Sequence, residues 1–206
     1  MSKKKTKEIW NREIHPDWYY DIPEMKVLII GSFPPHEDKY DYEFYYPNKQ
    51  NNFWKILSRI CTDADPKYYG GTEAVEERKS LMKKLKAGVQ NMGKIISRKE
   101  KSARDTDIKI EEFNDILSVI DQHPELETIL ISGYSAANSS YRAFVEYLKV
   151  NNIDFTIVEN VSPGETFAFS YKGRILKCVI VNSTSTASRI KLDTLVEQFS
   201  AVIKNL

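Results

Sequence analysis

One stretch of the chain, residues 25–60, carries side chains that could hold a planar ring and act on a bond beside it. Phe33 stands between a Gly-Ser turn and two prolines, where its ring could stack on a flat heterocycle for about 1–3 kcal/mol. Asn51 stands at the start of a helical pattern, where its amide could orient a water or cap the helix. An amide is a weak base, so this pattern predicts positioning chemistry and modest rates.

Two later turns offer hydroxyl groups. The turn at 133–137 mimics a nucleophile elbow around Ser135, but no histidine follows His123 to take the serine proton. We therefore expect Ser135 to be a helix N-cap. The turn at 182–188 carries Ser183, Thr184 and Ser185, whose hydroxyls suit phosphate contacts. The alternative is an ordinary strand-to-helix connection with a hydroxyl cap, which spacing alone favours.

Composition limits the other classes of chemistry. The chain has 206 residues, a net charge of +1, two cysteines and three widely spaced histidines, so we expect no metal, no iron–sulfur cluster and no cofactor. Neither a Walker A motif nor G-x-G-x-x-G is present. No apolar run is long enough to span a bilayer. These features predict a cytoplasmic protein without membrane contact, and we expect a monomer with a loose basic tail at 1–10 and a single domain at 11–206.

The apolar patterns predict helices alternating with strands after an extended lead-in at 11–24. We expect strands at 25–31, 89–97, 128–132, 155–158, 167–171 and 174–181. We expect helices at 51–61, 73–86, 110–123, 135–149 and 189–206, with Gly88 ending the second of them. Residues 62–72 have the composition of a turn, and 98–109 read as a charged connection.

This order of elements predicts an α/β fold, a three-layer sandwich whose central sheet has four to five mostly parallel strands flanked by helices. Ligands of such sheets bind beyond the carboxyl ends of the strands. The turns at 31–35, 133–137 and 182–188 each follow a strand and precede a helix. We therefore expect them to converge on one crevice, where helix N-termini could face an anion such as phosphate.

At these residues the chain resembles the uracil-DNA glycosylase superfamily, and within it most closely the hypoxanthine-DNA glycosylase-like branch. The resemblance runs from about Ile14 to the final helix. It is carried by LIIGSFPP, YYPNKQNNFWKIL, SARDTDI, SGYSAA and the late STS-A loop, and the spacing from the paired tyrosines to N-x-F-W is the most specific piece. The chain departs from the branch at Asn48–Gln50, where the branch has His-Pro-Arg, and Phe33 stands where uracil-specific enzymes carry a water-activating aspartate.

The resemblance assigns roles to particular residues. It implies that Asn51 is catalytic and that Arg189, with Ser183, Thr184 and Ser185, contacts DNA. The expected base-binding pocket consists of Gly31, Ser32, Phe33, Pro34, Tyr45, Tyr46 and Phe53.

The function that follows as an expectation is hydrolysis of the N-glycosidic bond of a deaminated base, uracil or hypoxanthine, in DNA, as in base excision repair. The expected partner is DNA carrying such a base, flipped out of the helix. Two alternatives stay open on the same scaffold. One is a noncatalytic module that binds nucleic acid or a nucleobase, and the other is an enzyme acting on free nucleosides.

Overall fold

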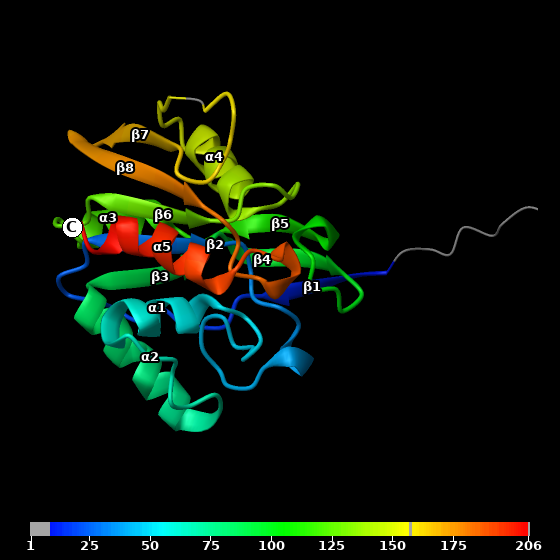
Figure 1. Cartoon of the computed structure of the whole chain (residues 1–206). Helices are drawn as coiled ribbons and strands as arrows, with labels where there is room; N and C mark the ends of the chain where they lie inside the picture. The colour runs from blue at the N-terminus through cyan, green and yellow to red at the C-terminus, as the bar shows by residue number, and fades with distance from the viewer. Residues whose placement is uncertain (1–8, 157, 206) are drawn as a thin grey trace, which may run out of the picture.

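The computed structural model describes residues 9–156 and 158–205, and its main feature is a five-stranded sheet (Figure 1). The strand order is β3-β2-β6-β8-β7, with four parallel strands and an antiparallel β7 at one edge. The strands span β2 Val27–Gly31, β3 Ala87–Asn91, β6 Thr128–Ser132, β7 Thr166–Tyr171 and β8 Arg174–Val181. The predicted mostly parallel sheet is thus confirmed, as are the strand at 128–132 and the hairpin of β7 and β8.

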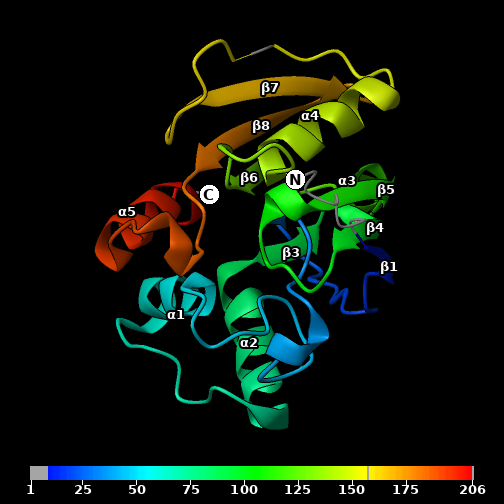
Figure 2. The same cartoon turned by 90° about the vertical axis from the view of Figure 1, so that its right-hand side faces the viewer.

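Helices cover both faces of this sheet, which gives the predicted three layers (Figure 2). Helices α1 and α5 lie on one face and α3 and α4 on the other, while α2 packs beside β3. Their bounds are α1 Phe53–Thr62, α2 Gly71–Leu85, α3 Ile116–Gln122, α4 Ser140–Val150 and α5 Leu192–Ile203. The inner strands are buried on both sides, and every residue of β2, β3 and β6 is buried. Long apolar runs such as VLIIG are typical of this arrangement.

A second, antiparallel sheet has the order β1-β4-β5 and was not predicted. Its strands are β1 Trp10–Ile14, β4 Gly93–Lys99 and β5 Ile108–Phe113. The lead-in at 11–24 therefore begins as a strand, and the single strand expected at 89–97 is two strands, β3 and β4. The helix expected at 110–123 is wrong in its first part, because β5 pairs with β4 up to Phe113. Of the predicted tail at 1–10, residues 1–8 lie outside the described part, and Trp10 begins β1.

Several predicted boundaries are also wrong. Helix α2 ends at Leu85, and its C-cap is Lys86, whose left-handed backbone has φ 49°. Gly88 therefore does not end the helix but lies within β3, under the Met25 side chain. Helix α4 begins at Ser140 with Ser139 as its N-cap, so Ser135 is not the cap. Of the strand expected at 155–158, Phe155 forms an isolated bridge with Phe169, and residue 157 lies outside the described part. The assignment of 11–206 to one domain stays a prediction.

Candidate functional site

The turns that follow β2, β6 and β8 lie at the same carboxyl edge of the sheet, because these strands are parallel neighbours. The single crevice expected there stays a prediction. The Asn52 backbone N–H donates to the Thr184 carbonyl at 3.1 Å, which joins the start of α1 to the loop after β8. Gly133 follows β6 and lies against Ser183, since a Cβ placed on it would stand 3.5 Å from the Ser183 Cβ. The aromatic segment 40–46 joins the same edge through Tyr46.

Tyr46 reaches across the end of β2 to Gly31. A Cβ on Gly31 would lie 2.7 Å from the Tyr46 hydroxyl and 2.5 Å from Asn91 Oδ1, at the end of β3. These approaches leave room for glycine alone at position 31, which is the physical reason for the glycine in this turn. The Tyr46 hydroxyl is buried and has no hydrogen-bond partner among the described residues, and its burial raises the pKa of Tyr46 well above its usual value.

The Tyr46 ring stacks on Phe53, with centroids 3.8 Å apart and planes 14° apart. Tyr46 is half-buried, whereas Phe53 is fully buried at the start of α1. Tyr45 is also fully buried, and its hydroxyl donates to Gln90 Oε1 at 2.9 Å. Within the predicted pocket set, Phe53 and Tyr45 thus lie beneath the surface, whereas Tyr46 and Phe33 are half-buried.

Phe33 is half-buried on the side of the second sheet. Its ring meets His15 edge-on, with centroids 5.5 Å apart, and the Arg98 guanidinium carbon lies 5.7 Å from the ring centroid. A Cβ on Gly93 would stand 2.9 Å from the Phe33 ring. Pro34, the next residue, is buried, and its carbonyl accepts a hydrogen bond from Arg98 at 2.7 Å. The turn at 31–34 is therefore fixed from β4 as well as from the main sheet.

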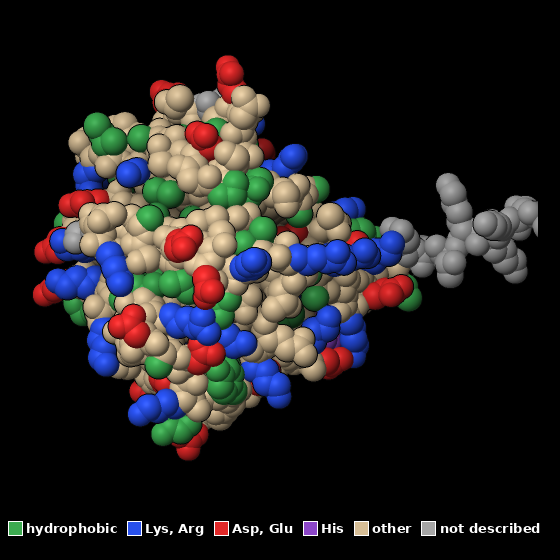
Figure 3. Space-filling model, viewed as in Figure 1, with side chains coloured by type: hydrophobic (Ala, Val, Ile, Leu, Met, Phe, Trp, Pro, Cys, Tyr) green, Lys and Arg blue, Asp and Glu red, His purple; other side chains and the backbone are tan. Residues whose placement is uncertain are grey.

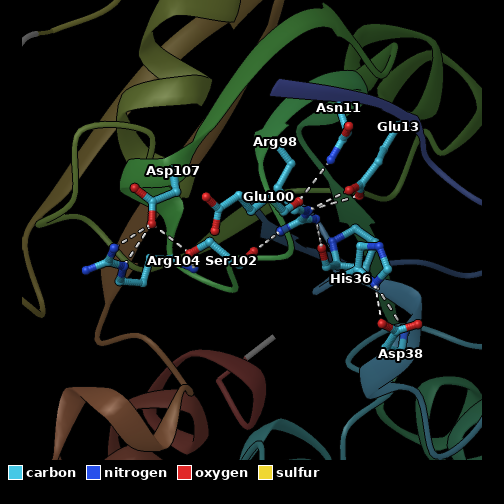
Figure 4. Close-up of polar contacts among 10 residues, drawn as sticks. Asn11, Glu13, His36, Asp38, Arg98, Glu100, Ser102, Arg104 and Asp107 are labelled. Atoms are coloured by element: carbon cyan, nitrogen blue, oxygen red, sulfur yellow. Dashed lines mark hydrogen bonds and ion pairs between the residues drawn. The ribbon is translucent and has the colours of Figure 1, made fainter. Parts of the chain in front are cut away.

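Arg98 is the anchor of this region, with a side chain that is 2% exposed (Figure 4). Its Nε donates to both carboxylate oxygens of Glu13, at 2.8 and 3.0 Å, and its Nη1 donates to the Ser102 carbonyl at 2.6 Å. A buried guanidinium is tolerated only when its charge is paired and its donors are satisfied. Arg98 thus ties β1, β4 and the 100–107 loop to the carboxyl end of β2.

His15 completes the polar layer under the turn. Its Nδ1 lies 2.6 Å from the Pro16 carbonyl oxygen and its Nε2 lies 2.9 Å from Asn91 Nδ2. The neutral ring satisfies both contacts, because Nδ1–H donates to Pro16 and Nε2 accepts from Asn91. Burial lowers the pKa of His15 to about 4. His15 therefore fixes the Asn91 amide, whose Oδ1 points at Gly31.

The predicted catalytic residue Asn51 is half-buried at the start of α1. Its Oδ1 accepts from the Phe53 backbone N–H at 2.9 Å, so Asn51 satisfies the first N–H of α1, whereas the N-cap residue itself is Asn52. The amide oxygen has a second lone pair, and Nδ2 has no hydrogen-bond partner among the described residues. Capping therefore fixes the amide without using up its hydrogen-bonding capacity.

The loop 182–188 uses its hydroxyl oxygens locally. Ser183 Oγ accepts from the Ser185 N–H, and Ser185 Oγ accepts from the Ala187 N–H, both at 3.3 Å. Thr184 is buried, whereas Ser183 and Ser185 are half-buried. The local cap is thus observed, and because each of the two serine hydroxyls acts as an acceptor it still has a hydrogen to donate.

Positive side chains flank this edge. Lys and Arg run in a row from the loop after β8 toward the second sheet (Figure 3). The exposed basic side chains of the β4–β5 loop and of the loop after β8 include Lys101, Arg104, Arg189 and Lys191. Lys101 pairs with Asp38 and Arg104 with Asp107, while Arg189 and Lys191 have no ion-pair partner among the described residues. Arg189 has a left-handed backbone, with φ 58°, where it ends the short helix η3, Thr186–Ser188.

One functional candidate, Asp105, received no role in the sequence analysis, although it is an aspartate of the SARDTDI segment that carries part of the resemblance. It begins the short helix η2, Asp105–Asp107, in the loop between β4 and β5. Its Oδ1 accepts from Ser32 Oγ at 2.6 Å, which brings a carboxylate to the turn after β2. The Asn138 amide donates to the backbone carbonyls of Asp105 and Ile108 and holds the segment in place. Burial raises the pKa of Asp105, although Ser32 and Arg98 oppose the rise.

A cavity of about 740 Å³ lies elsewhere, between α4 and β5, and Tyr134, Ser135 and Asn138 form part of its wall. The predicted site residues do not line it. Within the described part of the chain, no three His, Cys, Asp or Glu side chains cluster as metal ligands would, and no helix has the length and apolarity needed to cross a membrane.

Comparison with known proteins identifies the class of fold. No family model and no curated protein matches the chain. Among solved structures, the fold is similar to that of a uracil-DNA-glycosylase-like α/β protein. That protein is a "putative Uracil DNA glycosylase" from Methanosarcina acetivorans, solved by solution NMR, with a TM-score of 0.57 and 20% sequence identity over 89% of this chain and 91% of that chain. At this identity the likeness establishes the fold.

Proposed function

We propose that the protein is a DNA glycosylase that hydrolyses the N-glycosidic bond of a deaminated base, uracil or hypoxanthine, in DNA. The observation that carries the proposal is the meeting of the turns after β2, β6 and β8, where Asn52 bonds Thr184 and Tyr46 crosses Gly31. The glycosylase fold of the solved relative supports it.

The proposed reaction begins when the base leaves the helical stack, which costs a few kcal/mol and less at a mismatch. Tyr46 and Phe33 are the aromatic side chains at the site that remain partly accessible, and the base stacks on one of them. Backbone N–H groups of the 31–32 turn stabilise the negative charge that develops on the leaving base. Asn51 orients the water through the lone pair of Oδ1 that the helix does not use.

DNA binding in this proposal depends on the row of cations and on the loop after β8. Arg189 and Lys191 are exposed and free of ion pairs within the described residues, so each can neutralise a phosphate. The hydroxyls of Ser183 and Ser185 keep a hydrogen to donate to a phosphate oxygen. These contacts position the DNA strand without reading its base sequence.

A second candidate is a noncatalytic module that binds damaged DNA or a nucleobase at the same edge. It is favoured by the hydrogen bond that Asn51 Oδ1 already accepts from the Phe53 N–H, because a purely capping asparagine would make the same bond. An enzyme of free nucleosides remains the third candidate, and turnover without duplex DNA would identify it.

The test is a panel of labelled duplexes, each holding one damaged base, scored for base release as abasic sites. Wild type is expected to release uracil or hypoxanthine. The rate of release by Asn51→Ala should be lower by about 100-fold or more, because the group that positions the water is lost. Asn205→Ala, on the C-terminal segment, serves as the matched asparagine control. Binding without release by wild type selects the module, and equal release by wild type and Asn51→Ala removes that residue from the mechanism.

A further inference from the structure

Asp105 brings a carboxylate to a site otherwise formed by amides, hydroxyls and aromatic rings. The loop between β4 and β5 places it against Ser32, across 73 positions of sequence. Figure 4 shows the neighbouring residues Ser102, Arg104 and Asp107 bonded to one another, so that the loop is fixed on both sides of Asp105. Asn138 holds its backbone from the turn after β6. Three separate segments therefore position this one carboxylate.

The contacts of Asp105 are incomplete for a purely structural carboxylate. Its Oδ1 accepts from Ser32, but Oδ2 has no hydrogen-bond partner among the described residues, and Oδ2 is not among the wholly enclosed polar atoms there. No described cation forms an ion pair with it; Arg98 acts on it from a distance and is itself paired with Glu13. A half-buried carboxylate with one open oxygen can hold and deprotonate a water.

We propose that Asp105 is the catalytic base of the glycosylase reaction, with Oδ2 taking a proton from the attacking water. The inference rests on the proposed function and extends it to a residue on a different loop. Ser32 fixes the carboxylate through Oδ1, and the neighbouring Gly31 is the residue that the Tyr46 hydroxyl approaches.

The proposed step moves one proton from water and replaces one bond at the sugar carbon. One O–H bond of the water breaks and its proton goes to Asp105, while the water oxygen bonds to the sugar C1′. The C1′–N bond breaks and its electron pair stays on the base nitrogen. The base then takes up a proton from solvent, and Asp105 returns its own proton to solvent.

The experiment compares single-turnover base release by wild type, Asp105→Asn and Asp105→Ala between pH 5 and 8. Asp105→Asn keeps an oxygen for Ser32 but cannot accept a proton, so its rate should fall by about 10²–10⁴-fold. The wild-type rate should rise with pH through the titration of the carboxyl, and that rise should be absent in Asp105→Asn. Formate should restore part of the activity to Asp105→Ala, where it can occupy the vacated space, but not to Asp105→Asn.

Asp154→Asn is the matched control, because Asp154 is an exposed aspartate in the connection between α4 and β7. Its rate should stay within a few-fold of wild type. Affinity for a duplex with an abasic site, followed by anisotropy, should be equal in wild type and Asp105→Asn. If Asp105→Asn releases the base as fast as wild type, or loses DNA binding together with activity, the inference is refuted while the glycosylase function stands. If wild type releases no base from any duplex, the proposed function fails first and the inference fails with it.

Discussion

Substitution of Gly31 by alanine tests whether Tyr46 and Asn91 fill the end of β2. The new methyl would stand 2.5 Å from Asn91 Oδ1 and 2.7 Å from the Tyr46 hydroxyl, distances at which something must move. Asn91 is held by His15 and Tyr46 by its stack on Phe53, so neither can yield freely. Overpacking of this kind costs about 1–3 kcal/mol, and we expect the upper half of that range.

The measurement is urea unfolding, followed by tryptophan fluorescence, of wild type, Gly31→Ala, Tyr46→Phe and the double variant. Tyr46→Phe removes a buried hydroxyl that has no partner among the described residues, so alone it should change stability little. In the double variant one of the two close atoms is gone, and the cost of Gly31→Ala should fall by about 1 kcal/mol. An equal cost of Gly31→Ala with Tyr46 and with phenylalanine at 46 would refute the described packing.

Three further outcomes are expected. Folding lowers the pKa of His15 from an ordinary 6.5 to about 4, so the stability that the neutral ring contributes is complete above pH 6.5 and is lost as the pH falls toward 4. The difference in unfolding free energy between wild type and His15→Gln should therefore change by about 3 kcal/mol over that range. A difference that stays constant with pH would contradict the buried neutral ring. Arg98→Met leaves Glu13 unpaired and should cost about 3–5 kcal/mol in urea unfolding, whereas a cost below 1 would disprove the anchor. Arg189→Ala should lower the salt dependence of DNA binding by about one phosphate contact, measured by anisotropy titrations at several salt concentrations, and an unchanged slope would place the phosphate elsewhere.

The main sheet could be predicted from sequence because its strands are buried on both faces. VLIIG and TILIS contain no polar residue inside the run, and such runs fit a parallel sheet covered by helices. The β7–β8 hairpin was equally readable, since Lys172-Gly173 supplies the two positive φ values that its turn needs. Local composition decided these elements.

The second sheet escaped prediction because local composition gave a different answer there. Ile110, Phe113 and Leu117 have helical spacing, yet β5 pairs with β4 and the helix begins only after Asp115, whose side chain caps it. Asn114 marks the boundary, since its amide donates to the carbonyls of Asn91 and Gly93. Long-range pairing thus overrode the periodicity, and the Asn-Asp pair was the available signal.

The candidate site was predicted in part for the same reason. The turns after β2 and β8 were expected to meet because parallel strands end at one edge. Asp105 could not be found from spacing, since its contact with Ser32 depends on how the β4–β5 loop folds back over the sheet. Arg98 likewise looked like one charge in a basic run, and its burial against Glu13 is visible only in three dimensions.

A crystal structure of Asn51→Ala bound to a duplex that carries uracil or hypoxanthine would show whether the turns after β2, β6 and β8 hold a base drawn out of DNA. We expect the flipped base to stack on Tyr46 or Phe33, with Asp105 within hydrogen-bonding distance of the sugar face or its water. A base that stays stacked in the duplex, or DNA seated over the α4–β5 cavity with this edge open to solvent, would contradict this expectation.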